Sequence, residues 1–222
     1  MIEVHGLTKV LGNRTVIDDI TASFPAGTVT ALLGLNGAGK TTLLRLIAGL
    51  TRPDAGAVRT GGPVGFHLGP GAMNPRHTVG RHLAWLAALH GVAAARIDAV
   101  LAEAGLAGRR RERIDRLSLG MRQRLAIAST LLADPRTLLF DEPLNGLDVP
   151  GIVWFRGLLR RLADDGRTVV VATHLLGEVA LTADRILLLV DGRLHTAGPL
   201  RDLTPHGADV REWLETTLLE CV

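Results

Sequence analysis

Short apolar runs bounded by Gly, Asp or Pro recur along the chain and predict buried strands. They lie at Ile2–Val4, Thr28–Leu33, Thr137–Phe140, Thr168–Ala172 and Arg185–Val190. Apolar residues at helical spacing predict helices over Lys40–Ala48, Ile152–Ala163 and Leu175–Ala180. Uninterrupted apolar strands are typical of a sheet that is covered on both faces. The alternation therefore predicts an α/β fold with a mainly parallel sheet and helices on both sides.

The stretch 78–133 breaks this alternation, because its leucines and alanines follow a helical period and no strand-like run is present. Gly91 interrupts the helical pattern. We therefore expect a helical insert within the α/β core. At the short carboxyl end, Val190–Gly198 has the pattern of a terminal hairpin, and helices are expected around Leu200 and over Val210–Leu219. No regulatory domain fits in that length.

The composition is that of one globular domain with a substantial core, since 47% of the 222 residues are hydrophobic. It excludes disordered, collagen-like and small disulfide-rich proteins. Lys9 and Lys40 are the only lysines and tyrosine is absent, so a net charge of +3 is enough to give a pI of about 9.9. The pI is therefore no sign of nucleic-acid binding, and no nucleic-acid partner is expected.

One dense charge run, Arg109–Arg116, reads RRRERIDR. We interpret it as a solvated helix face, because Glu112 and Asp115 dilute its positive charge. Contact with an acidic partner loop or with lipid headgroups is the alternative.

Several features point to the cytoplasm. The first ten residues are charged and lack the apolar segment of a signal peptide. The single cysteine, Cys221, cannot form an internal disulfide, which fits a reducing compartment. No run approaches the roughly 20 uninterrupted apolar residues that span a bilayer. We therefore expect a cytoplasmic protein whose work at a membrane needs a partner chain.

A glycine-rich motif between a predicted strand and a predicted helix carries the clearest chemistry. Residues 34–41 read GLNGAGKT and fill the phosphate-loop pattern G-x-x-x-x-G-K-[ST]. Its glycines allow backbone N–H groups to surround a polyphosphate, and Lys40 adds a positive charge for the β- and γ-phosphates. Thr41 offers a hydroxyl to Mg²⁺, and Thr42 can reach the α-phosphate. The predicted nucleotide-binding residues here are Gly34, Leu35, Asn36, Gly37, Ala38, Gly39, Lys40, Thr41 and Thr42.

Two adjacent carboxylates follow the predicted strand Thr137–Phe140. Because α/β sheets bind ligands at the carboxyl ends of their strands, we expect Asp141 to hold Mg²⁺ through water and Glu142 to polarise the attacking water. Taken alone, the pair could be two exposed acids before Pro143. A phosphate loop in the same chain favours the catalytic interpretation.

The phosphate loop alone does not distinguish ATP from GTP, because guanine-nucleotide proteins use the same loop. They read guanine with an Asn-Lys-x-Asp motif, and neither lysine of this chain lies in one. ATP with Mg²⁺ is therefore the expected ligand.

Residues 117–125 read LSLGMRQRL, and Ser118 and Gly120 open a further predicted helix. The N-terminus of that helix is a second anion site in the same chain. One nucleotide has no obvious use for both sites. A dimer resolves this if the turn from Ser118 to Gly120 of each copy closes over the γ-phosphate held by the other copy.

With these motifs in this order, the chain resembles the nucleotide-binding subunit of ATP-binding cassette (ABC) transporters. The resemblance implies one ABC ATPase domain over 1–222, with a P-loop NTPase core at 1–75 and 135–222 that includes an N-terminal antiparallel β part. It also implies a helical subdomain at about 76–134. The partners implied are a second nucleotide-binding subunit in a homodimer and an integral membrane permease, with the chain peripheral on the inner face of the cell membrane.

Two further residues take their roles from this resemblance. In LNGLD, residues 144–148, Asp148 looks like the D-loop aspartate that crosses the dimer interface. His174, at the end of VVVATH, looks like the switch histidine that contacts the γ-phosphate. The segments GMRQRL and THLLGEV are most similar to subunits of bacterial drug and antibiotic exporters whose membrane part is a separate chain.

The chain departs from the family pattern at two positions. The family stacks adenine on an aromatic side chain near the start, where this chain has Leu11, so weaker ATP binding is expected. The family's Q-loop glutamine, which touches the Mg²⁺–water cluster and abuts the membrane subunit, aligns with Gly69. Asn74 is a poorly placed substitute. Either Mg²⁺ carries one more water here, or coupling to the membrane subunit is altered, unless Gly69 is required by the backbone.

The resulting hypothesis is an ATP-hydrolysing subunit that dimerises around two ATP molecules and powers export of a drug-like or antibiotic compound. One alternative is a non-transport ABC ATPase, but such members typically carry long coiled-coil insertions or two cassettes. Another is a nucleotide-gated scaffold with weak hydrolysis, suggested by Gly69 and opposed by Glu142 and His174.

Overall fold

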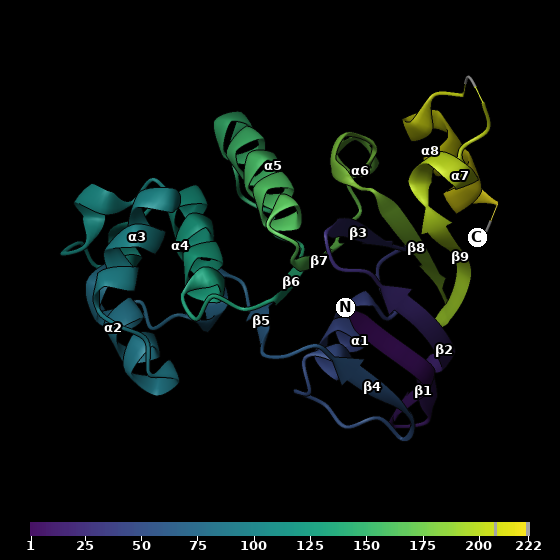
Figure 1. Cartoon of the computed structure of the whole chain (residues 1–222), viewed down its shortest axis with the longest axis horizontal. Helices are drawn as coiled ribbons and strands as arrows, with labels where there is room; N and C mark the ends of the chain where they lie inside the picture. The colour runs from purple at the N-terminus through teal and green to yellow at the C-terminus, as the bar shows by residue number, and fades with distance from the viewer. Residues whose placement is uncertain (207, 221–222) are drawn as a thin grey trace.

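The computed structural model describes residues 1–206 and 208–220 of the chain. Cys221, on which the inference about the redox compartment rests, lies outside these residues. The described chain forms two β-sheets, a group of helices at one end and a pair of C-terminal helices at the other (Figure 1).

The larger sheet has six strands in the order β5-β6-β7-β3-β8-β9. Five of them run parallel, and β8 pairs with β9 as an antiparallel hairpin. The strands are β3 (Thr28–Leu33), β5 (Val64–His67), β6 (Thr137–Asp141), β7 (Thr168–Ala172), β8 (Arg185–Val190) and β9 (Arg193–Pro199). The predicted parallel sheet and the predicted terminal hairpin are confirmed.

The smaller sheet is antiparallel and has the order β2-β1-β4, which confirms the expected N-terminal antiparallel part. It consists of β1 (Ile2–Leu11), β2 (Arg14–Phe24) and β4 (Ala55–Thr60). The apolar run at Ile2–Val4 predicted only the start of β1. The rest of β1 and β2 alternates between buried and exposed positions and is interrupted by irregular register, so it lacks the continuous apolar run of a central strand.

Helices cover both faces of the larger sheet, as predicted. On one face, α1 (Lys40–Ile47) is sandwiched between the two sheets and buries Leu43, Leu44 and Ile47. The other face is covered by α5 (Val149–Asp164), α6 (Leu176–Thr182), α7 (Leu200–Leu203) and α8 (Val210–Leu219). Burial on both faces explains why β3 and β7 are almost wholly apolar.

The segment between β5 and β6 contains the predicted helices. They are α2 (Val79–His90), α3 (Ala95–Glu103) and α4 (Leu119–Leu131), with short 3₁₀ turns at Pro70–Ala72, Ala107–Arg109 and Ile114–Arg116. Gly91 ends α2 in a left-handed conformation, which accounts for the break seen in the sequence pattern. The apolar core of these helices is continuous with that under α5.

The arginines of the run Arg109–Arg116 are exposed, as predicted, but the run forms short 3₁₀ turns and no α-helix, so the predicted helix face is wrong. The chain instead turns back against α2, where the N–H of Val79 donates to the Glu112 carbonyl and that of Gly80 to the Arg110 carbonyl. Three of the arginines form salt bridges. Arg109 pairs with Glu112 and Arg113 with Asp115 inside the run, and Arg110 pairs with Asp98 on α3.

Among the described residues, no helix is both long enough and apolar enough to cross a membrane.

Candidate functional site

The phosphate loop connects the carboxyl end of β3 to the N-terminus of α1, as predicted. Its glycines are required by the backbone. Gly34 has a φ of +152°, and a Cβ there would lie 2.4 Å from the Leu189 carbonyl oxygen. Gly39 has a φ of +109°, and a Cβ there would lie 2.7 Å from the Val16 carbonyl oxygen. A side chain at either position would therefore push the loop away from the strands that shape it.

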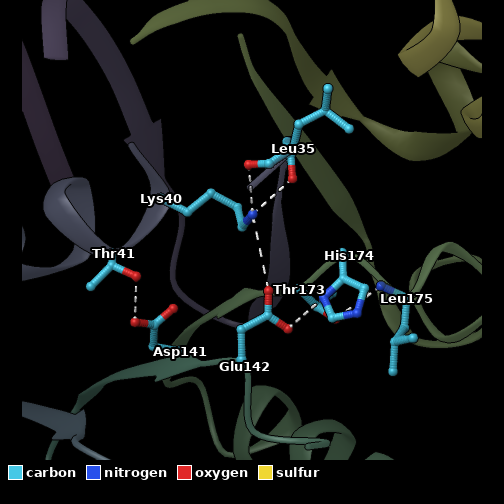
Figure 2. A network of polar contacts seen from close by, with 9 residues as sticks. Leu35, Lys40, Thr41, Asp141, Glu142, Thr173, His174 and Leu175 are labelled. Atoms are coloured by element: carbon cyan, nitrogen blue, oxygen red, sulfur yellow. Dashed lines mark hydrogen bonds and ion pairs between the residues drawn. The ribbon is translucent and has the colours of Figure 1, made fainter. Parts of the chain in front are cut away.

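Lys40, the first residue of α1, is only 7% exposed and folds back over the loop (Figure 2). Its Nζ donates to the Gly34 carbonyl at 2.7 Å and to the Leu35 carbonyl at 3.2 Å, and it lies 4.0 Å from Oε1 of Glu142. Burial lowers the pKa of the ammonium group, while the charges of Glu142 and Asp141 oppose this effect. Because it is buried, the positive charge of Lys40 is weakly screened by water and interacts strongly with a negatively charged ligand.

The Thr41 hydroxyl donates to Oδ2 of Asp141 at 2.7 Å, which joins the start of α1 to the end of β6 (Figure 2). Oδ1 of Asp141 is buried and has no hydrogen-bond partner within the described residues. A hydroxyl and a carboxylate with a spare oxygen are hard oxygen donors that suit Mg²⁺. The two residues predicted to hold the metal are therefore brought together, with a set of atoms that fits it.

Glu142 follows Asp141 in an unusual backbone conformation with a φ of +45°. A non-glycine residue is strained there, and such strain is held in place by surrounding contacts. Its N–H donates to the Ala172 carbonyl at 2.9 Å, and its own carbonyl accepts from the Asn145 N–H at 3.3 Å. The conformation turns the carboxylate toward the phosphate loop and toward His174, as Figure 2 shows.

His174 comes from the loop after β7 and is exposed. Its Nδ1 lies 3.0 Å from Oε2 of Glu142. An ionised carboxylate can only accept a hydrogen bond, so this contact assigns the proton to Nδ1. The two predicted catalytic residues are thus in direct contact, although they come from different strands.

An open hollow lies beside Lys40, Asp141 and Glu142. It is lined by Val16, Asn36, Gly37, Gly39, Lys40, Thr41, Thr42, Asp141 and Glu142. Val16, on β2, was missed in the sequence because β2 itself was not predicted. Leu11, the predicted cover for adenine, is half exposed at the end of β1 and does not line the hollow.

Ser118, Gly120 and Asp148 do not line this hollow either. Ser118 is exposed and caps α4, where its Oγ accepts from the Met121 N–H at 3.2 Å, so the helix begins at Leu119. Asp148 caps α5 by accepting from the Gly151 N–H at 2.9 Å. The backbone carbonyl of Gly146 would lie 3.2 Å from a Cβ at Gly120, so the two motifs meet within one chain. A role for these residues on nucleotide remains a prediction.

Gly69 lies at the start of the turn after β5 with a φ of +73° and a ψ of 172°. A Cβ there would meet no atom within 4 Å, so space is not the constraint. The backbone conformation is one that glycine adopts and other residues avoid. Asn74 is engaged in its own loop, where Oδ1 accepts from the Arg76 N–H at 3.0 Å. The structure thus supplies a backbone reason for the glycine.

A buried polar group next to the site was also missed by the sequence analysis. His67 ends β5 and Gln123 lies on α4, and each is 1% exposed. Nε2 of Gln123 donates to the Pro143 carbonyl at 2.7 Å and lies 3.4 Å from Nε2 of His67. Burial lowers the pKa of His67 to about 4, against a smaller opposing effect of Asp141. Little signal was available, because β5, the strand that His67 ends, was itself not predicted.

Comparison with known proteins gives consistent matches. The model of the family described as ABC transporter matches residues 17–145. The ATP-binding protein YhcH of Bacillus subtilis (strain 168) is 38% identical, over 87% of this chain and 68% of YhcH. The lantibiotic transport ATP-binding protein SrtF of Streptococcus pyogenes is 30% identical, over 87% of this chain and 89% of SrtF. The aliphatic sulfonates import ATP-binding protein SsuB 2 of Streptomyces avermitilis is 39% identical, over 87% of this chain and 78% of that protein.

Solved structures share the fold. An ATP-binding subunit of an ABC transporter superposes with a TM-score of 0.87 at 27% identity, over 98% of this chain and 99% of that chain. The ATP-binding cassette MJ0796, in a dimeric post-hydrolysis state bound to ADP and Pi, superposes with a TM-score of 0.83 at 26% identity, over 90% of this chain and 99% of that chain.

Proposed function

This chain belongs to the ABC transporter family as an ATP-binding ATPase, and we propose that two copies close around two ATP molecules to power a separate membrane subunit. The observation that carries the proposal is the position of Glu142, whose carboxylate lies 3.0 Å from His174 and 4.0 Å from Lys40 at one hollow. A base, a cation for the phosphates and a polar side chain that orients the base are thereby assembled at one place.

In the proposed reaction, the backbone of the phosphate loop and Lys40 hold the β- and γ-phosphates. Thr41 and, through water, Asp141 would hold Mg²⁺, which would neutralise charge on the phosphate oxygens. Glu142 accepts a proton from the water that attacks the γ-phosphorus, while the bond from that phosphorus to the β,γ-bridging oxygen breaks and ADP leaves. His174 holds Oε2 of Glu142, which leaves the other carboxylate oxygen directed toward Lys40.

The proposed dimer is supported by the exposure of Ser118, which caps the N-terminus of α4. Ser118 is exposed and does not line the chain's own phosphate hollow, which supports a contact with the nucleotide held by a second copy. The likeness to the dimeric cassette MJ0796 supports the same arrangement. ATP would bridge the copies through its γ-phosphate, and hydrolysis would remove the bridge.

We propose that the membrane subunit is a separate permease and that the cargo is an exported drug-like or antibiotic compound. Support for export comes from the segments GMRQRL and THLLGEV and from the 30% identity to SrtF, which is named for lantibiotic transport. SsuB 2 is named for import of aliphatic sulfonates, so uptake is the competing direction. The chain would act at the cytoplasmic face of the cell membrane.

Reconstitution tests this proposal. The reading frames next to the gene are searched for a multi-span membrane protein, and a protein found there is co-expressed with the chain and placed with it in proteoliposomes. We expect complex formation, ATP hydrolysis and ATP-dependent movement of an antibiotic away from the face that carries the chain, all of the turnover being lost in Lys40→Ala. Movement in the opposite direction would overturn export. Hydrolysis by a chain that forms no membrane complex would support a non-transport ATPase, and ATP binding without hydrolysis would support a scaffold.

A further inference from the structure

The buried contact between His67, Gln123 and Pro143 joins three segments that meet behind the hollow. His67 is the last residue of β5, Gln123 lies on the second turn of α4, and Pro143 follows Glu142. Both polar side chains are 1% exposed. Nε2 of Gln123 makes both polar contacts of the group, while Nδ1 of His67 and Oε1 of Gln123 are buried without a hydrogen-bond partner among the described residues.

The chemistry of the partners fixes the amide of Gln123. The Pro143 carbonyl can only accept, so the atom 2.7 Å away must be the NH₂ nitrogen, Nε2. Its second N–H is available to Nε2 of His67 at 3.4 Å. That atom accepts only when it carries no proton, which assigns the neutral Nδ1–H form to the ring.

Gln123 therefore bridges α4 to the turn that follows β6 and carries Glu142, here called the catalytic turn. Five residues before it, Ser118 caps the start of α4, and one residue before Pro143 stands the strained Glu142. A shift of α4 relative to β5 or β6 would break one of the two contacts of the amide. The orientation of Glu142 and the position of the helix N-terminus are thereby linked through one side chain.

We propose that Gln123 and His67 are positioning residues, which set the catalytic turn at Glu142 according to where α4 stands. The inference rests on the proposed function, because it concerns the step for which Glu142 is the base. Gln123 acts by holding the Pro143 carbonyl, and His67 acts by holding Gln123. Neither touches nucleotide.

The alternative is that this pair only stabilises the core. The two cases differ in kinetics. A positioning role predicts that Gln123→Met, which keeps the length of the side chain and loses both hydrogen bonds, lowers kcat about 3- to 10-fold with KM for ATP changed less than about twofold. His67→Leu should act in the same direction. His67→Gln, which restores an acceptor near the place of Nε2, should recover part of the rate.

The chain offers a matched control on the same helix. His82 is buried and its Nε2 lies 3.2 Å from Oγ of Ser129, near the other end of α4 and away from the catalytic turn. His82→Leu therefore removes a comparable histidine contact to α4. We expect its kcat to stay within about twofold of the wild type.

The experiment combines these rates with nitrogen NMR of the imidazoles in the wild-type chain. We expect His67 as the neutral Nδ1–H form at pH 7, with its Nε2 signal shifted in Gln123→Met. The Nε2–H form would overturn the assigned contact, even if a variant fails to fold. Gln123→Met at the wild-type rate, beside an inactive Glu142→Gln, would overturn the positioning role and leave the proposed function intact. An active Glu142→Gln would instead contradict the proposed function.

Discussion

Nδ1 of His174 lies 3.0 Å from Oε2 of Glu142, although 32 positions separate the two residues in the chain. The contact exists because β6 and β7 are parallel neighbours, so the residues that follow them emerge at the same edge of the sheet. Glu142 is further constrained by its φ of +45°. The carboxylate is thus oriented before any water is bound, as a general base requires.

The first prediction concerns this carboxylate. Glu142→Gln should keep ATP binding and lose turnover, because the amide has the same shape at the same backbone strain but cannot take a proton. General-base catalysis contributes about 10²- to 10⁴-fold. Release of phosphate at steady state and binding of ATP to the same preparation provide the check. A residual rate above about a tenth of the wild type would remove Glu142 from the role of base.

A second prediction concerns Leu11, which stands where the family stacks adenine on an aromatic side chain. Leu11 is half exposed at the end of β1. Leu11→Tyr should tighten ATP binding about 3- to 10-fold, since stacking on a base is worth about 1–3 kcal/mol and a leucine already supplies part of the cover. Titration calorimetry would measure it. Val10→Tyr is the control, because neighbouring residues of a strand point to opposite faces. Equal effects at both positions, or none at position 11, would show that Leu11 does not face the base.

The glycine after β5 gives a third prediction. At a φ of +73°, Gly69→Gln should lower the free energy of unfolding by about 1–3 kcal/mol through backbone strain. The Mg²⁺ concentration for half-maximal ATPase should not improve. Gly69→Ala should lose as much stability, because the cost lies in the backbone and a Cβ meets no atom. A lower Mg²⁺ midpoint with an unchanged melting temperature in the glutamine variant alone would restore the coupling role of this position.

Acid sensitivity gives a fourth prediction. The pKa of buried His67 is lowered to about 4 from the usual 6.5. The unfolded chain therefore binds this proton near pH 6.5 and the folded chain only near pH 4. The contribution of His67 to stability is complete above pH 6.5 and declines as the pH falls, by about 3 kcal/mol in total once pH 4 is passed.

Urea unfolding of the wild type and of His67→Leu between pH 7 and 4 would measure this contribution. The variant should lose less stability over that range, since all other titrating groups are common to both chains. Parallel pH profiles would show that His67 does not titrate with folding.

Structural features that are determined by residues close together in the chain could be predicted from the sequence. The strand Thr28–Leu33 and the loop around Lys40 carry continuous apolar runs and required glycines, and both were predicted within a residue. β2 escaped prediction because its half-buried alternation and irregular pairing with β1 are set by the other sheet and α1. Val16 was lost with it.

Other features depend on contacts between distant segments. The contact of Gln123 with Pro143 joins α4 to the turn after β6, and no pattern in the sequence predicts it. The conformation of Gly69 could be weighed but not decided, because an unmatched glycine looks the same whether a ligand is missing or the backbone requires it. In the run Arg109–Arg116, the charges correctly predicted exposure. The backbone conformation differs from the predicted helix because the run is hydrogen-bonded to the start of α2.

The shared-site dimer is the central claim, and mixing two inactive variants tests it most directly. Lys40→Ala damages the phosphate-loop side of a site, and Ser118→Arg damages the side that we propose is contributed by the other copy. In a heterodimer both lesions fall in one composite site and the other site is intact. Lys40→Ala mixed with Glu142→Gln is the control, because both lesions lie on the phosphate-loop side and leave no intact site.

The measurement is ATPase activity of differently tagged chains, with the heterodimer isolated by both tags. If the two sites act independently, the isolated heterodimer of Lys40→Ala with Ser118→Arg should show about half of the wild-type rate, because one of its two sites is intact, while the isolated control heterodimer shows none. Heterodimers of the first pair that stay as inactive as either parent would contradict the shared site.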